Sequence, residues 1–237
     1  MNRSYRGIVP LLLFAALSPA ASAFSRLPAA SQDGKAAARP PASSLTRPAS
    51  PAKPAGADGF IQRWLLLEPI GVPGQLTESA VRTAVEKDFS VPATPFPHDA
   101  DKLTIGDSEL AWHAVDTLNY NVNLYHFAYA LNKPTTNVLF WAVTVVNAPR
   151  EMSGVRLAIG SNAASVWWVN GREATALYND RQAVIDDGVS RRLTLNQGAN
   201  VIRAAIVNAG GATDFCARFI DENDRPIKML TATLTAR

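Results

Sequence analysis

The chain has 237 residues, 47% of them hydrophobic, and a formal net charge of +3. Residues 1–58 hold seven Lys and Arg against two Asp and Glu, so residues 60–237 hold sixteen against eighteen and carry a formal charge of −2. This slightly acidic part gives no electrostatic reason to expect nucleic acid as a partner. Cys216 is the single cysteine, which excludes a disulfide within the chain, and its apolar neighbours predict that it is buried.

The N-terminal residues have the pattern of a secretory signal peptide. Arg3 and Arg6 precede an apolar run over residues 8–17, and the small residues 21–23 form a cleavage site. We expect residues 1–23 to be removed after Ala23 and the protein to be secreted or periplasmic. Residues 24–58 are rich in Ala, Pro and Ser, which predicts a disordered tether. Residues 60–237 are then one domain, with no transmembrane segment in the mature chain.

The first half of the domain begins with an apolar strand over residues 60–67. Thr77 can cap a helix from Glu78 to about Phe89, the one helix that the apolar spacing favours. Residues 102–105 and 109–115 flank Gly106-Asp107-Ser108 and predict a hairpin. Residues 124–131 are interpreted as a strand because their aromatic residues alternate.

The second half reads as a series of short strands separated by turns. Residues 138–147 are apolar on both faces, as expected for a central strand covered on both sides. Asn170-Gly171 separates two strands and predicts a tight hairpin, since a type I′ turn needs two residues with positive φ. Further strands are expected at 155–159, 191–195, 201–207 and 215–220. The fold class is therefore mostly β, an antiparallel β-sandwich or jelly roll with one short helix.

Residues for hydrolytic chemistry are few. Ser108, in a Gly-Asp-Ser run similar to the start of the GDS-type esterase motif, could act with His113 or His126. That motif requires a C-terminal His, whereas His126 is the last histidine, and the chain has no G-x-S-x-G sequence. The alternative interpretation is a polar hairpin turn and structural histidines.

Acidic and aromatic residues suggest binding sites. Asp186, Asp187 and Asp214 are candidate ligands for a structural calcium ion, although Asp is also common in turns because its side chain bonds the local backbone. Trp167 and Trp168 are adjacent in a strand and so point to opposite faces. We expect Trp168 to be core and Trp167 to be accessible for stacking on a sugar; the alternative is that a loop or the helix covers Trp167. The residues expected to bind a ligand are Trp167, Tyr178, Trp112 and Asn121.

The last third of the chain resembles the galactose-binding-like jelly-roll modules of secreted carbohydrate-active enzymes. The matching segments are VWWVNGR at 166–172, DDG at 186–188, an L-x-L-x-x-G-x-N-x-I pattern at 193–202, and residues 215–219. The final turn, at 221–226, lacks the glycine common in such modules. Residues 64–68 and 112–127 also resemble proteins called acetylxylan esterases.

The resemblance implies a secreted, non-catalytic module that binds plant or bacterial polysaccharide or serves as accessory to a secreted carbohydrate-active enzyme. Two alternatives remain from the sequence. One is a small carbohydrate esterase of the acetylxylan-esterase type. The other is a structural module of the cell envelope without affinity for sugar.

Overall fold

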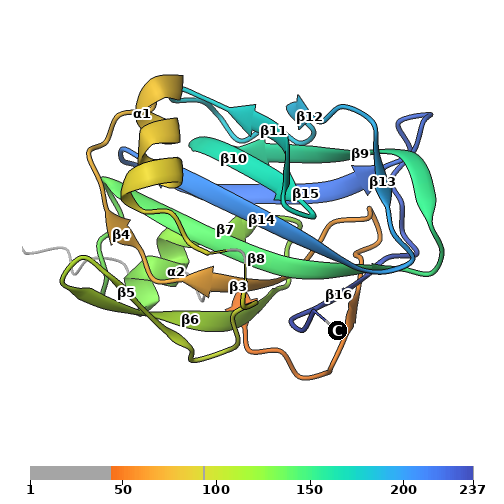
Figure 1. The fold of residues 1–237 in the computed structure, drawn as a ribbon, viewed down its shortest axis with the longest axis horizontal. Helices are drawn as coiled ribbons and strands as arrows, with labels where there is room; N and C mark the ends of the chain where they lie inside the picture. The colour runs from red at the N-terminus through yellow and green to blue at the C-terminus, as the bar shows by residue number, and fades with distance from the viewer. Residues whose placement is uncertain (1–43, 93, 237) are drawn as a thin grey trace, which may run out of the picture. The chain divides into compact units, whose positions relative to one another are not determined.

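The computed structural model describes residues 44–92 and 94–236, which form a two-sheet antiparallel β-sandwich with a helical segment packed on the larger sheet (Figure 1). The expected mostly β fold is confirmed. The expected signal peptide and residues 24–43 of the expected tether lie outside the described residues. Among the helices of the described part, none is long and apolar enough to cross a membrane.

The larger sheet has β8 and β14 near its centre, and these two long strands pair over their whole length. Strand β11 forms one edge and β1 the other. Along its main path the order is β1 (Leu45–Thr46), β6 (Ser108–Thr117), β3 (Arg63–Leu67), β8 (Val138–Ala148), β14 (Gly198–Asn208), β10 (Ala164–Val169) and β11 (Arg172–Leu177). Short strands attach beside it: β2 (Lys53–Pro54), β4 (Ile70–Gly71), β5 (Lys102–Ile105) and β16 (Thr231–Thr233).

The smaller sheet is built on β9 (Met152–Ser161) and β15 (Asp214–Ile220), which pair antiparallel. Its other strands are β12 (Gly188–Val189), β7 (Val122–Asn123) and β13 (Leu193–Leu195). The main core lies between the two sheets. Trp64 of β3, Trp167 of β10 and Phe215 of β15 meet there edge to face, all three buried.

A second apolar cluster covers the outer face of the larger sheet. Helix α1 (Glu78–Thr83) and the π-helical turn η1 (Ala84–Asp88) place Val81 and Val85 against Trp141 of β8 and Val166 of β10. Strand β8 is therefore buried on both faces, as its sequence predicts. The helix begins where expected, but Thr77 makes no side-chain capping hydrogen bond.

Two expectations about local structure are wrong. Residues 124–130 form a helix, α2 (Leu124–Ala130), instead of a strand, because Asn123 caps it: its Oδ1 accepts a hydrogen bond of 2.7 Å from the His126 backbone. The described part of the expected tether, residues 44–58, is ordered against the domain. Strands β1 and β2 pair with β6 and β16, and the Ser50 carbonyl accepts a hydrogen bond from Arg63. The domain therefore extends on the N-terminal side of Phe60.

The hairpin expectations are confirmed. The β5–β6 hairpin turns at Gly106 and Asp107, and the β10–β11 hairpin turns at Asn170 and Gly171, with φ values of 50° and 77°. Cys216 lies on β15 and is buried, as expected. Burial, the largest effect on it, raises the pKa of the Cys216 thiol to about 12.

Candidate functional site

The expected sugar-stacking residue Trp167 is buried and cannot act as a platform. Its exposed fraction is 0%, its indole Nε1 donates to Ser165 Oγ at 3.0 Å, and its ring contacts Trp64 and Phe215. Trp168, expected to be core, is the half-buried member of the pair and stacks on Trp141 at 5.7 Å. Trp167 faces the smaller sheet across the main core, whereas Trp168 faces the cluster that α1 and η1 cover, so neither side chain is freely exposed.

The other expected ligand residues lie apart from one another. Trp112 is buried with 2% exposure in the cluster under the helical segment. Tyr178 is half-buried beneath the guanidinium of Arg82, 5.8 Å from its ring centre. Asn121 donates to Asp214 Oδ2 at 2.6 Å, so the structure does bring together one expected ligand residue and one expected metal ligand. These residues do not share a site.

The residues of the esterase alternative are not assembled as a catalytic set. Ser108 and His113 are five residues apart on β6, so they face opposite sides of the strand at about 16 Å, given about 3.3 Å per residue. His113 Nε2 instead lies 3.3 Å from Glu68 Oε1, and His126 is on α2. Although burial raises the pKa of Glu68, hydrogen bonds from Lys133 and His113 lower it below its ordinary value overall. This cluster is an ion-pair network, and no hydroxyl group of the described residues forms a hydrogen bond with His113.

The acidic residues proposed for calcium each have another partner. Asp186 forms an ion pair with Arg218, and Asp187 with Arg181. Burial raises the pKa of Asp214, with the Asn121 hydrogen bond acting in the opposite direction. Within residues 44–92 and 94–236, no three His, Cys, Asp or Glu side chains are grouped as metal ligands. The three aspartates are thus not brought together in the geometry that a calcium ion requires.

A polar groove on the surface was missed by sequence reasoning. It has a volume of about 730 Å³ and is lined by residues of the β10–β11 hairpin of the larger sheet and of β13 and its flanking residues of the smaller one. Polar side chains dominate its surface. The residues lining this groove are Val169, Asn170, Arg172, Glu173, Ala174, Arg191, Arg192, Leu193, Thr194 and Asn196. Its size falls within the range of about 300–1,000 Å³ that ligand sites occupy.

A buried asparagine holds the two walls of the groove together. Asn200 on β14 has 0% exposure, and its Oδ1 accepts from Asn170 Nδ2 at 2.8 Å and from the Asn196 backbone at 2.9 Å. Its Nδ2 donates to the carbonyls of Asn196 and Gly198. The turn before β11 and the turn after β13 are therefore fixed to the same side chain. This gives a structural role to the L-x-x-G-x-N pattern, which runs from the end of β13 into the start of β14.

The single carboxylate of the groove is already neutralised. Arg82 of α1 donates from Nη1 and Nη2 to the two oxygens of Glu173, each at 2.9 Å. These hydrogen bonds hold the pKa of Glu173 below its usual value, although partial burial acts against them. The same interaction raises the pKa of Arg82. Glu173 therefore stays ionised and occupied, and contributes little negative charge to a ligand in the groove.

The arginines of the groove have unused hydrogen-bond donors. Arg172 and Arg191 are exposed, and within the described residues neither guanidinium forms an ion pair or donates a hydrogen bond. Arg192 donates to the Gly154 carbonyl at 3.4 Å. Guanidinium groups pair with planar carboxylates through two parallel hydrogen bonds. The groove is thus suited to a polar ligand that carries carboxylates. In the sequence, the available indications were Arg172 directly after Asn-Gly and the Arg191-Arg192 pair at the start of the strand expected at 191–195.

No protein-family model and no curated protein matches the chain. Among solved structures, the PA14 domain of the MpAFP antifreeze protein covers 79% of this chain and 94% of its own, with 13% identity and a TM-score of 0.43. A PA14 sugar-binding domain from an RTX adhesin covers 74% of this chain and 100% of its own, with 10% identity and a TM-score of 0.44. A family 35 carbohydrate-binding module from Clostridium thermocellum covers 44% of this chain and 89% of its own, with 20% identity and a TM-score of 0.24.

Proposed function

We propose that this protein is a non-catalytic polysaccharide-binding domain and that the groove between β11 and β13 binds a chain bearing carboxylate groups, such as a polyuronate. The observation that carries the proposal is the pair of exposed arginines, Arg172 and Arg191, which form no ion pair within residues 44–92 and 94–236 and line a polar groove of about 730 Å³. Amide and hydroxyl groups beside them offer donors and acceptors for sugar hydroxyls.

A location outside the cytoplasm is part of the same proposal. The basic, apolar and small-residue pattern of residues 1–23 supports export, and exported protein would meet extracellular polysaccharide directly. Sequencing the N-terminus of the exported protein tests this part separately. A mature chain that begins at Phe24 is expected, and an intact Met1 terminus on protein retained in the cytoplasm contradicts it.

The binding test compares two ligands that share a backbone but differ in charge. Polygalacturonate is expected to bind the purified protein, whereas fully methyl-esterified polygalacturonate is expected to bind much more weakly. Because an exposed ion pair contributes about 0.2–1 kcal/mol, the Arg172→Ala/Arg191→Ala double variant should lose about 2- to 30-fold in affinity, measured by isothermal titration calorimetry. Binding should also weaken as salt is raised from 0.05 to 0.5 M, as expected from screening on the order of 10 Å.

Arg47→Ala is the matched control, since Arg47 is exposed and follows β1 at the opposite edge of the larger sheet. Its affinity should equal that of the wild type. Equal binding of the charged and esterified polymers would contradict the role of the arginines. Equal binding of single-stranded DNA would show a general anion site and contradict the polysaccharide assignment.

The esterase alternative remains a separate proposal with its own assay. Release of acetate from acetylated xylan, abolished by Ser108→Ala, would establish it. The separation of Ser108 from His113 along β6 leads us to expect no release above buffer.

A further inference from the structure

A second, smaller cavity lies on the outer face of the larger sheet. It has a volume of about 140 Å³ and is bounded by the sheet, by the β5–β6 hairpin and by the proline-rich segment after η1. Apolar side chains make up most of its wall, and one arginine from the sheet enters it. The lining residues are Val91, Pro92, Pro95, Pro97, Asp101, Lys102, Leu103, Trp112, Val143 and Arg203.

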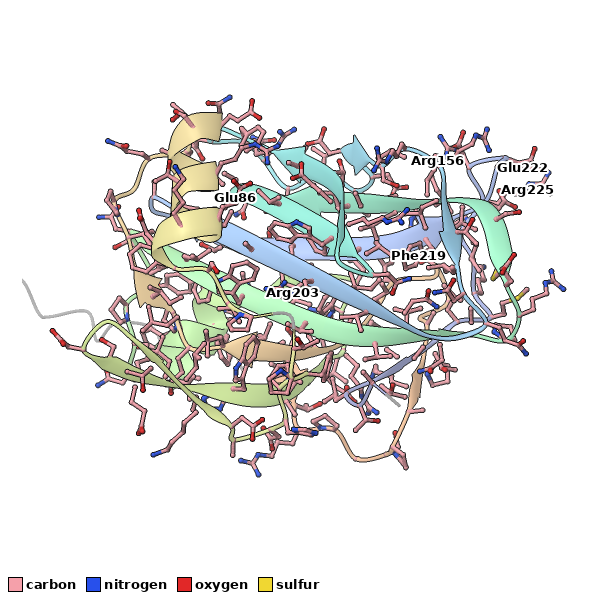
Figure 2. The ribbon with its side chains drawn as sticks, viewed as in Figure 1. Glu86, Arg156, Arg203, Phe219, Glu222 and Arg225 are labelled. Atoms are coloured by element: carbon pink, nitrogen blue, oxygen red, sulfur yellow. The ribbon has the colours of Figure 1, made fainter. Side chains whose placement is uncertain are left out.

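Arg203 is held in place by aromatic rings. It lies on β14 between Val143 of β8 and Trp168 of β10, its cross-strand neighbours. Its guanidinium carbon is 4.9 Å from the centre of the Trp141 ring and 5.9 Å from that of Trp168. Figure 2 shows Arg203 over the middle of the larger sheet, between α1 and the β5–β6 hairpin. Two rings thus fix the plane of the guanidinium, and cation–π attraction stabilises it.

The hydrogen bonds of Arg203 are incomplete. Its Nη2 donates to the Val91 carbonyl, whereas its buried Nε has no partner. No carboxylate of residues 44–92 and 94–236 forms an ion pair with it. By contrast Arg63, which is 1% exposed, bonds both oxygens of Asp116 at 2.8 and 2.9 Å. The protein therefore neutralises the fully buried Arg63 internally and leaves the half-buried Arg203 without an anion among the described residues.

Burial without an anion is unfavourable for a cation. Desolvation lowers the pKa of Arg203 below its ordinary value. A bound carboxylate would supply the missing negative charge and accept the unused N–H groups. Asp101 does not fill this role, because it lies at the rim and accepts hydrogen bonds from His98.

We propose that this cavity binds a small organic carboxylate whose acid group pairs with Arg203 and whose apolar body lies against Trp112, Leu103 and Val143. An apolar cavity of about 150 Å³ holds a benzene molecule, so about 140 Å³ accommodates a body of roughly one six-membered ring. A planar monoanion fits the single guanidinium better than a phosphate, which needs more donors than this apolar wall provides. This site is separate from the groove, so the proposal of a carboxylate site does not depend on whether the groove binds polysaccharide.

The test uses benzoate as the probe and benzamide as its uncharged counterpart. Saturable binding of benzoate by calorimetry is expected, with benzamide weaker by about tenfold or more, the effect of losing a charge-assisted hydrogen bond. Arg203→Met should weaken benzoate binding by a similar factor. Arg47→Met, an equivalent change of an exposed arginine outside the cavity, should leave it unchanged.

Leu103→Trp provides a second variant that keeps Arg203 intact. Leu103 lies half-buried on the hairpin strand β5, so a larger side chain there should fill the cavity while the sheet remains folded, as circular dichroism would verify. Loss of benzoate binding in this variant supports the site, including the case in which Arg203→Met does not fold. The proposal is overturned if wild-type protein shows no saturable benzoate binding, if benzamide binds equally well, or if Leu103→Trp binds as the wild type does.

Discussion

Replacing Trp167 with alanine should destabilise the domain strongly. Its ring is fully buried between the sheets, with ring-centre distances of 6.0 Å to Trp64 and 5.4 Å to Phe215, both edge to face. The substitution would leave a cavity at this junction. It would also leave the buried hydroxyl of Ser165 without the indole N–H that it accepts at 3.0 Å.

The expected loss is about 4 kcal/mol, within the range of about 3–5 kcal/mol for truncating a buried aromatic residue. Two favourable edge contacts, each contributing about 0.5–1.5 kcal/mol, keep the expected loss above the lower end of that range. For a domain of this size, about 2–4 °C of melting temperature is lost per kcal/mol, so the midpoint should fall by about 8–16 °C. Differential scanning calorimetry of the purified domain measures it.

Trp168→Ala is the matched comparison, because Trp168 is the next residue but only half-buried. It should lose about 1–2 kcal/mol through its contact with Trp141 and Arg203. Trp167→Phe, which retains a ring, should fall between the two. A Trp168→Ala variant that melts far below Trp167→Ala would refute the orientation of β10 described above.

Three further outcomes are expected. Asn200→Ala should cost about 2–4 kcal/mol in urea unfolding, since it leaves several buried groups of the groove walls unpaired, and an unchanged midpoint would mean that water replaces the amide. Glu68→Gln should lower the free energy of unfolding by about 1 kcal/mol at pH 7. Because the pKa of Glu68 is lowered in the folded state, this difference in stability between variant and wild type should vanish as the pH falls from 4.5 through the folded pKa. A difference that stays constant with pH contradicts the ion pair with Lys133. Cys216, with a pKa near 12, should react with iodoacetamide at pH 8 only after unfolding, so prompt labelling of native protein contradicts its burial.

The strand arrangement was largely predictable from local sequence. Asn170-Gly171 requires positive φ at two residues and thus marks its hairpin without reference to the rest of the fold. The double-sided apolar pattern of residues 138–147 likewise reflects the two layers that cover β8. Such features are local or repeat with the strand period, so one sequence is sufficient to find them.

Helix α2 was missed because two patterns coincide in residues 124–131. Their aromatic residues alternate like those of a strand, whereas Tyr125 and Tyr129 are also spaced as neighbours on a helix, where their rings stack at 6.2 Å. The Asn123 cap, which decides in favour of the helix, is a single residue before the run. The capping residue was therefore more informative than the alternation.

The orientation of Trp167 and Trp168 depends on tertiary structure. Expecting one of them to be exposed assumes a sandwich with one wet face, but α1 and η1 cover the outer face of β10. Strand β11 also shifts its register with β10 between the two tryptophans. Neither the position at which the helix packs nor this register shift can be read from the alternation of residues along the strand. The groove residues were missed because they come from strands of different sheets, which only the tertiary structure brings together.

The net charge of this domain and the local charge of its groove predict ligands of opposite charge. Residues 60–237 carry a formal charge of −2, which by itself disfavours an anionic partner. In the folded structure, Asp116 and Glu173 each form an ion pair with an arginine. Within the described part of the chain Arg172 and Arg191 form no ion pair, although the charge of Arg191 helps to lower the pKa of Glu173. Because salt screens charges beyond about 8–10 Å, a ligand in the groove interacts mainly with these arginines and only weakly with the rest of the surface. The proposed acidic ligand therefore follows from the pairing of charges within the fold and not from the composition.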